Sequence, residues 1–344
     1  MKKLLNTLFV TSEKAYLTLE GENIVVLNEK VKLGRYPLHI LQSIVCFSYA
    51  GASPALMGAC TERNIGISFC TPRGKFLARV ANQSNGNVLL RKKQYQVSCD
   101  LSESCKIAKL MILGKVFNCR QSIQRTIRDN ALRIDTSNLK NTSAFLKESL
   151  SSIYEVKDLD SLRGIEGNCA NQYFNCFDLM LLNPDKEIFS FNKRNRRPPM
   201  DPVNALLSFS YSLLANDCAS SLEAIGLDSY VGFLHRDKPG RNSLALDLME
   251  ELRPCVADRF VLTLINNKVV SKSDFDYLDS GAVFLNEKGR RVFLAKWQDR
   301  KQDEIVHPYL KEKVKWGMIP YVQALLLSRV LRGDLSEYPP FFWR

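Results

Sequence analysis

GFLHRDKPGRNSLALDLMEELRP, residues 232–254, joins an apolar segment that ends in a histidine to a helix that carries acidic residues. At about 100° per residue, the helix expected over 243–256 sorts into two faces. Leucine, alanine, methionine and valine side chains cover one face. Asp247 and Glu250 lie side by side on the other face, close enough to share one cation. A solvated acidic face is the alternative interpretation of these carboxylates.

His235 ends the apolar segment, and the Pro-Gly turn after it leads directly into the acidic helix. The chain therefore brings an imidazole close to two carboxylates. A histidine whose hydrogen bonds are satisfied within the core is the alternative. The other two histidines, His39 and His307, lack acidic companions at a useful spacing, so we interpret them as structural or surface residues.

Glu166 is the third candidate acid, in RGIEGNCANQYF between Gly164 and Gly167. Two glycines in a helical segment suggest the close approach of another chain or of a ligand. An acid favoured by the dipole at a helix N-terminus is the alternative. A set of two acids and one histidine offers mostly oxygen ligands, which suits Mg²⁺ or Mn²⁺. Such an ion can polarise a phosphodiester and activate an attacking hydroxyl.

The chain around this segment predicts an α+β protein. Residues 1–85 contain short β-branched or alternating runs between turn residues, with one helix over 53–64, and predict a small β-rich domain. The polar stretch 81–87 marks the boundary, residues 86–96 are the expected linker, and 97–344 predict a larger, mainly helical domain. Within it, the segments over 243–260 and 308–331 read as helical, and 284–294 as a hairpin around Lys288 and Gly289.

Composition narrows the class of function. The 344 residues carry a net charge of +12, which favours a polyanionic partner, nucleic acid first and an anionic membrane second. The uncharged run from Tyr36 to Cys60 is interrupted by proline and glycine and is no membrane span. Ten scattered cysteines without a CxxC pair indicate reduced core thiols and a cytoplasmic protein. A basic but ordinary enzyme is the alternative, weakened by the lack of a nucleotide-binding loop.

The segment NKRNRRPPMDP, residues 192–202, offers the most concentrated positive charge. Arg194, Arg196 and Arg197 precede two prolines, which stiffen the backbone and favour a rigid presentation of charge to phosphates. A solvated basic surface is the alternative.

RGIEG (163–167), RRPPMDPVNALLSFSYSLL (196–214), the segment 232–254 and the terminal YPPF (338–341) together resemble one family. This is the CRISPR-associated integrase, the larger protein of the spacer-acquisition complex, and the resemblance is closest to the subtype I-C form. It covers essentially the whole chain in matching order. It implies a metal-dependent DNA endonuclease and integrase that joins the 3′-hydroxyls of a short captured duplex to the ends of a CRISPR repeat.

The resemblance also implies roles for individual residues. The family's metal ligands correspond to Glu166, His235 and Glu250, although many relatives have Asp at the last position. Asp247 matches a further acid of the catalytic set and is expected to support the ligands. The residues expected to contact DNA are Arg163, Arg194, Arg196, Arg197, Arg241 and Arg253, the last of them where the family places a cation near the scissile phosphate.

The partners implied are double-stranded DNA, a second copy of the chain, and a small ferredoxin-like CRISPR-associated protein that bridges two homodimers. We expect the N-terminal domain to supply much of the dimer contact, because the run from Tyr36 to Cys60 is more apolar than a small domain can hide. Two alternatives stay open. One is a structure-selective nuclease of DNA or RNA in repair. The other is a non-catalytic DNA-binding scaffold whose acids are surface charge.

Overall fold

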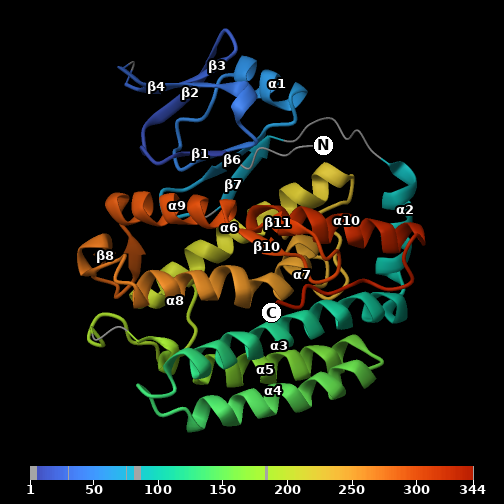
Figure 1. The fold of residues 1–344 in the computed structure, drawn as a ribbon. Coiled ribbons are helices and arrows are strands. Elements are labelled where there is room, and N and C mark those ends of the chain that lie inside the picture. The colour runs from blue at the N-terminus through green and yellow to red at the C-terminus, as the bar shows by residue number, and fades with distance from the viewer. Residues whose placement is uncertain (1–5, 30, 75, 81–86, 183–184, 344) are drawn as a thin grey trace.

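Strands and helices occupy different parts of the chain in this computed structural model, which describes residues 6–343 except 30, 75, 81–86 and 183–184. Seven strands gather at one end of the molecule, and long helices form the rest (Figure 1). This arrangement confirms the expected α+β class, with a β-rich N-terminal part and a mainly helical C-terminal part.

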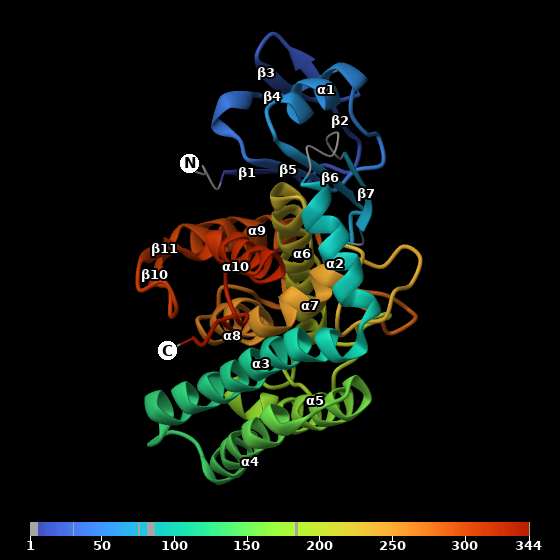
Figure 2. The ribbon, with the colours of Figure 1, turned by 90° about the vertical axis from the view of Figure 1, so that its right-hand side faces the viewer.

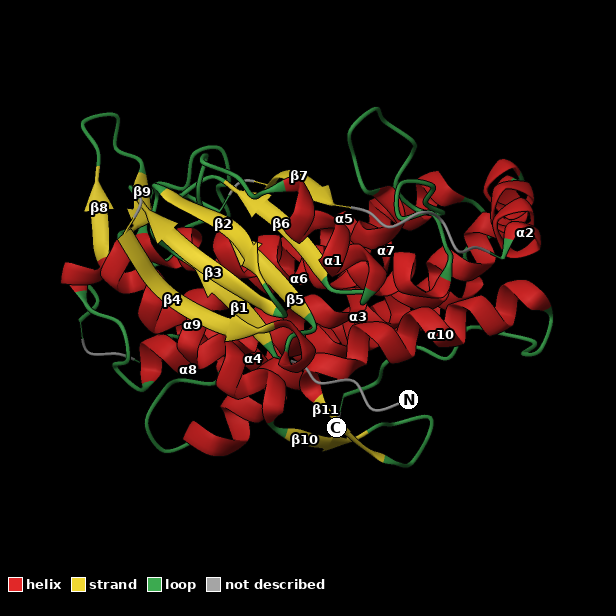
Figure 3. Cartoon of the chain, turned by 90° about the horizontal axis from the view of Figure 1, so that it is seen from above, coloured by secondary structure: helices red, strands yellow, loops and turns green. Residues whose placement is uncertain are grey.

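Two sheets build the N-terminal part and lie over helices α6 and α9 when the molecule is seen from above (Figure 3). In the four-stranded sheet, ordered β1-β5-β6-β7, the first three strands are parallel and β7 is antiparallel to β6. Its strands are β1 (Thr7–Val10), β5 (Ser43–Cys46), β6 (Gly66–Cys70) and β7 (Phe76–Val80). The antiparallel sheet consists of β2 (Ala15–Glu20), β3 (Asn23–Asn28) and β4 (Val31–Pro37). The helix expected over 53–64 is α1 (Pro54–Glu62), capped by the Ser53 side chain.

Strand β4, which the sequence did not reveal, carries part of the exposed apolar surface of this part. It lies at the edge of its sheet, and its Val31, Leu33 and Tyr36 are 64%, 53% and 39% exposed. In the run that begins at Tyr36, most apolar side chains are buried, but Ile40 and Tyr49 are 38% and 70% exposed. Our expectation that the N-terminal domain supplies much of the dimer contact stays a prediction.

The helical part is arranged around α6. Its helices are α2 (Val88–Cys99), α3 (Leu101–Asn130), α4 (Ser137–Glu155), α5 (Leu159–Asn175), α6 (Pro202–Ile225), α7 (Ser243–Leu252), α8 (Arg259–Asn266), α9 (Glu287–Gln302) and α10 (Ile319–Arg332). Helices α3, α4 and α5 form a layer at the end far from the sheets, and α6 and α7 lie between that layer and the sheets (Figure 2). This central position places α7 against α3, α6 and α10.

The segment 284–294 is a helix and not the hairpin we expected. Only Val283–Leu285 is a strand, β9, which pairs with β8 (Phe275–Tyr277), and α9 begins at Glu287. The Asn286 side chain caps this helix by accepting the Gly289 N–H at 2.9 Å. A Cβ at Gly289 would lie 2.2 Å from the Asp274 carbonyl oxygen, so the glycine serves close packing and not a turn.

The segment 308–331 is helical only in its second half. Lys313–Lys315 is strand β11, which pairs with β10 (Glu304–Val306), and α10 begins at Ile319, with Pro320 in its first turn. The segment 243–260 is helical throughout, but its middle, Arg253–Asp258, is a π-helix between α7 and α8.

Buried apolar side chains form two clusters, and the larger one includes Val45, Phe47 and Cys70 of the N-terminal part. One of them is drawn from Val10–Phe69 alone. The polar stretch expected to mark the boundary lies outside the described residues at 81–86. Residues 88–96 of the expected linker belong to α2, so this segment is a helix. The domains 1–85 and 97–344 stay a prediction.

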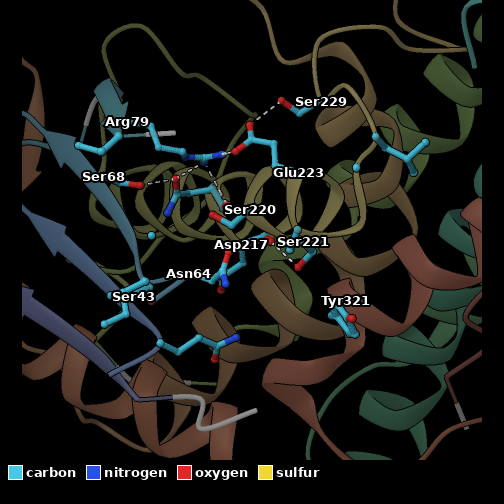
Figure 4. Close-up of a pocket in the computed structure, with 18 of the residues that line it drawn as sticks. Ser43, Asn64, Ser68, Arg79, Asp217, Ser220, Ser221, Glu223, Ser229 and Tyr321 are labelled. Carbon is cyan, nitrogen blue, oxygen red and sulfur yellow. Dashed lines mark hydrogen bonds and ion pairs between the residues drawn. The ribbon is translucent and has the colours of Figure 1, made fainter. Parts of the chain in front are cut away.

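A polar cleft of about 440 Å³ separates the four-stranded sheet from α6 and α10 (Figure 4). Arg79 of β7 crosses it, pairing with Glu223 at 2.7 Å and donating to the Asn216 side chain at 2.5 Å. Ser68 of β6 donates to the same Asn216 oxygen at 3.0 Å. These contacts tie the sheet to α6, and none of the candidate metal ligands lines this cleft.

His307 is a structural residue, as expected, and His39 is on the surface. The fully buried His307 ring accepts the Leu310 N–H at Nδ1, 3.2 Å away, and donates from Nε2 to the Gln323 side chain at 3.1 Å. Burial lowers the pKa of His307 below its usual 6.5. The unfolded chain therefore binds the proton more tightly than the folded one.

Because of this shift, we expect His307 to make the protein lose stability as the pH falls below about 6.5. Urea unfolding at pH 7.5 and pH 5.5 measures the loss, and a His307→Gln variant should show a smaller one. An equal loss in the two proteins would contradict the expectation.

The ten cysteines are unpaired and all but Cys99 are buried, which confirms the expected core thiols. Of the helices in the described part of the chain, none combines the length and apolar character that crossing a membrane requires.

Candidate active site

Helix α7 carries three acidic residues, and all three are buried. Asp247 and Glu251 are 0% exposed and Glu250 is 4% exposed. The solvated acidic face is therefore the wrong interpretation, because α3, α6 and α10 pack around this helix. Burying a carboxylate without partners costs several kcal/mol, so each of these acids needs compensating hydrogen bonds or charges. The partners of these three groups define the site.

Asp247 organises the loop that precedes α7. Its Oδ2 accepts the backbone N–H groups of Phe233 and Leu234 at 2.6 and 2.9 Å, and its Oδ1 accepts the His235 N–H at 3.0 Å. The same Oδ1 lies 2.6 Å from His235 Nδ1. A Cβ at Gly232 would lie 2.8 Å from Asp247 Oδ2, so this close wrap of the loop requires glycine. Asp247 thus supports the histidine, as the resemblance implies.

The His235 ring is held in one orientation. With Nδ1 donating to Asp247, Nε2 carries the lone pair of the ring, and a carboxylate orients metal-binding histidines in the same way in other proteins. Burial favours the neutral ring, but the hydrogen bond and charge of Asp247, together with the charge of Glu250, raise the pKa of His235 overall. The side chain keeps 29% of its surface exposed.

Glu166 and Glu250 meet at one ammonium group. Lys115 Nζ, from α3, forms an ion pair with Glu166 Oε1 and lies 2.6 Å from Glu250 Oε2. Two oxygens that contact the same nitrogen lie within about 6 Å of each other, twice a usual N–O distance. Arg253 pairs with the other oxygen of Glu250 at 2.6 Å. Helices α5 and α7, distant in sequence, thus present their carboxylates to a single point.

The charges around Glu250 stabilise its ionised form. Burial alone would raise its pKa, but Arg253 and Lys115 lower it well below the usual range. At Lys115 burial favours the neutral amine, but the charges of Glu250 and Glu166 outweigh it and raise the pKa of the ammonium. Glu250 Oε2 makes no well-aligned hydrogen bond. The site therefore holds two carboxylates that share the ammonium of Lys115 as their counter-charge.

Glu166 lies in the middle of α5 and not at its N-terminus, so the dipole does not explain it. A Cβ at Gly164 or Gly167 would meet no atom within 4 Å, and the close approach that these glycines suggested is not seen in the structure. Glu166 is 24% exposed and faces a cavity.

The donor set fits a divalent cation. Two carboxylates and one imidazole oriented by a carboxylate suit Mg²⁺ or Mn²⁺. As the side chains stand, no three His, Cys, Asp or Glu groups in the described part of the chain are gathered closely enough to hold an ion. Lys115 occupies the position between the two acids instead.

A cavity of about 280 Å³ adjoins Glu166 and Lys115. Tyr211 lines this cavity and donates a hydrogen bond to Asp258 at 2.5 Å. The Arg253 guanidinium lies over the Tyr211 ring, 4.3 Å from the ring centre. Basic side chains of the segment 192–202 complete the lining, namely Lys193, Arg194 and Arg196. Basic side chains therefore line the cavity that Glu166 faces.

The arginines expected to contact DNA fall into two groups. Arg196 and Arg197 are exposed. The other four have partners inside the protein. Arg163 donates to the Leu234 carbonyl at 2.7 Å, and Arg194 donates to Asn204 and Ser208. Arg241 donates to the Arg236 carbonyl, and Arg253 pairs with Glu250. These four shape the site and its loops.

Two features of the site escaped sequence reasoning. The sequence does contain one indication that Lys115 is buried. It lies on the apolar face of an amphipathic helix, beside Val116 and one turn before Cys119. Glu251 looked like its acidic neighbours, yet it anchors the C-terminal tail by accepting the Phe341 N–H at 2.8 Å and hydrogen-bonding Tyr338. Burial raises the pKa of Glu251 to about 7.

Comparison with known proteins identifies the family that the chain resembles. Residues 8–299 match the sequence profile described as CRISPR associated protein Cas1. Two curated relatives match over 100% of both chains: "CRISPR-associated endonuclease Cas1 1" of Chlorobaculum tepidum at 43% identity and "CRISPR-associated endonuclease Cas1 2" of Rhodospirillum rubrum at 47%. The solved structure of a casposase bound to integration product has a TM-score of 0.84 at 21% identity, covering 98% of this chain and 94% of its own. That likeness shows a shared fold.

Proposed function

The chain belongs to the Cas1 family of CRISPR-associated endonucleases, and from this premise we infer that it is a metal-dependent DNA endonuclease and integrase of CRISPR adaptation. The observation that carries the proposal is the meeting of Glu166 and Glu250 around one cationic group. The burial of these acids also counts against a scaffold whose acids are surface charge. The resemblance of the motifs favours the subtype I-C form, and the unpaired cysteines a cytoplasmic location.

In this proposal Glu166, Glu250 and His235 Nε2 hold the ion, Mg²⁺ or Mn²⁺. A bound ion of this kind polarises a phosphodiester and lowers the pKa of the hydroxyl that attacks it. Asp247 keeps the proton on His235 Nδ1, so that Nε2 stays available as a ligand. Arg253 keeps Glu250 ionised and turned toward the ion site.

The reaction can be tested by product analysis. Incubation with a short duplex carrying free 3′-hydroxyls and a plasmid containing a CRISPR repeat should yield branched or joined species, and EDTA should abolish them. Fragments alone, without joined products, would indicate a hydrolytic nuclease and contradict the integrase proposal.

The basic segment 192–202 is proposed to bind duplex DNA through its exposed arginines. Arg196 and Arg197 are the accessible charges, whereas Arg194 is engaged with Asn204. Changing Arg196 and Arg197 together to Ala should weaken binding to all duplex sequences alike. It should also reduce the slope of log K against log salt by about 0.9 for each phosphate that the protein no longer neutralises. Fluorescence anisotropy over a salt series measures both. A weakening confined to one sequence, or unchanged binding, would place the DNA elsewhere.

The protein is proposed to act as a homodimer, with a small ferredoxin-like CRISPR-associated protein bridging two dimers around double-stranded DNA. Exposed Val31 and Leu33 on the edge strand β4 support a self-contact there, because such an edge needs covering. Light scattering at micromolar concentration should report a dimer, and Leu33→Asp should shift it toward monomer. A wild-type monomer would contradict this part of the proposal.

A further inference from the structure

Lys115 is the one buried lysine among the residues that the structure describes, with 7% of its surface exposed. Its helix, α3, packs both on α5, which carries Glu166, and on α7, which carries Glu250. The approach is close, since a Cβ on the preceding Gly114 would lie 2.9 Å from the Glu251 side chain. The packing of α3 against α5 and α7 therefore places the Lys115 ammonium beside Glu166 and Glu250.

The ammonium stands where the two carboxylates can share a cation. It contacts one oxygen of each, and the remaining charge of Glu250 is balanced by Arg253 on the opposite oxygen. Without the ammonium, the buried Glu250 carboxylate and the partly exposed Glu166 carboxylate would face each other across a few ångströms, and their repulsion would disfavour this arrangement. Lys115 is thus what makes this pair of acids tolerable in the metal-free protein.

We propose that Lys115 is an internal cation that holds Glu166 and Glu250 ready for the divalent ion and must leave its position when that ion binds. The inference rests on the proposed function, since it assumes the ion site formed by these acids. An ammonium and a divalent cation cannot occupy the same point between two oxygens, because their repulsion would be large. Metal binding therefore includes the displacement of Lys115, and Lys115 lowers the affinity for the metal.

The cavity beside Glu166 can accommodate the displaced Lys115 side chain. Lys115 itself lines the cavity of about 280 Å³ beside Glu166, and its four-carbon stem is flexible. Asp258 lines the same cavity and offers a carboxylate there. Lys115 is in this view a positioning residue, which protects the geometry of the acids and sets how much metal is needed to load the site.

The test measures metal binding directly, without DNA. Mn²⁺ titration of the full-length protein, followed by the electron paramagnetic resonance signal of free Mn²⁺, gives the dissociation constant. Lys115→Met, which keeps length and removes charge, should bind Mn²⁺ at least about tenfold more tightly. Its metal-free melting temperature should fall below that of the wild type, and Mn²⁺ should raise it by more.

Two further variants separate displacement from a general change in charge. Lys193→Met removes a positive charge from the lining of the same cavity and should leave the Mn²⁺ affinity within about twofold of wild type. Lys115→Gln, polar and uncharged, should reproduce the tighter binding of Lys115→Met. A Lys115 variant that unfolds without metal and is restored by Mn²⁺ gives the same support, whereas one that Mn²⁺ does not restore counts against the proposal.

The outcomes distinguish the inference from the function on which it rests. Folded Lys115 variants that bind Mn²⁺ no more tightly than wild type would overturn the role of Lys115 and leave the metal site standing. Equal tightening in Lys193→Met would also overturn it, because charge alone would then account for the effect. Wild-type protein that binds no Mn²⁺ would overturn both the inference and the metal site.

Discussion

Glu166→Gln should lower metal-dependent cleavage and integration by at least about 10³-fold, as expected when an ion worth several kcal/mol to the transition state loses a ligand. The amide keeps the shape of the side chain but not its charge. Lys115 remains paired with Glu250, so the fold should persist. Initial rates of plasmid cleavage and of duplex joining, at saturating Mn²⁺, measure the effect.

Glu148→Gln is the matched control for this change. It makes the same substitution at an exposed position of the neighbouring helix α4, so its activity should equal that of the wild type. Circular dichroism melts of both variants check the fold. Full Mn²⁺-dependent activity in Glu166→Gln would show that the ion site has been assigned to the wrong residues.

Asp247→Ala should lower the free energy of unfolding by about 3–5 kcal/mol, the usual cost of removing one partner of a buried charged network. Asp247 accepts hydrogen bonds from three backbone N–H groups and from the His235 ring, and its removal leaves these donors without their partner. Urea denaturation measures the change. Activity should also be lost at temperatures where the variant is still folded, because His235 is no longer oriented.

Two companions sharpen this test. Asp160→Ala removes an exposed acid that pairs with Arg163 and Arg236, and should cost less than about 1 kcal/mol. Asp247→Asn keeps the shape and two acceptor lone pairs, so it should lie between Ala and wild type in stability. A loss below about 1 kcal/mol in Asp247→Ala would mean that the loop at 232–235 is held by other contacts.

Local sequence patterns were enough for most of the fold. Short β-branched or alternating runs between turn residues located β2, β3, β6 and β7, and apolar periodicity located α3, α5 and α6, because each pattern depends on residues close in the chain. They failed where neighbours decide the outcome. The sequence Lys288-Gly289 is typical of a turn, but both residues lie in the first turn of a helix that the Asn286 side chain caps. Gly289 is needed there because a Cβ would collide with the Asp274 backbone.

The same distinction applies to the candidate site. Glu166, His235, Asp247 and Glu250 could be nominated from residue type, spacing and resemblance. The burial of Asp247 and Glu250 could not be predicted, because the sequence of an acidic helix face is the same whether water or three other helices cover it. The expected DNA contacts show the same limit, since Arg194 and Arg253 turned out to have partners within the protein.

The sequence by itself determined the class of fold and the family, because these depend on residues close in the chain or on their order, and it nominated the acids and the histidine of the proposed site. Only the tertiary structure decided that Glu166 and Glu250 share one point and that Lys115 fills it. Those three residues come from separate helices, and their meeting depends on how α3 packs against α5 and α7. A buried charge is tolerated only where packing supplies its counter-charge, and packing is a property of the whole chain.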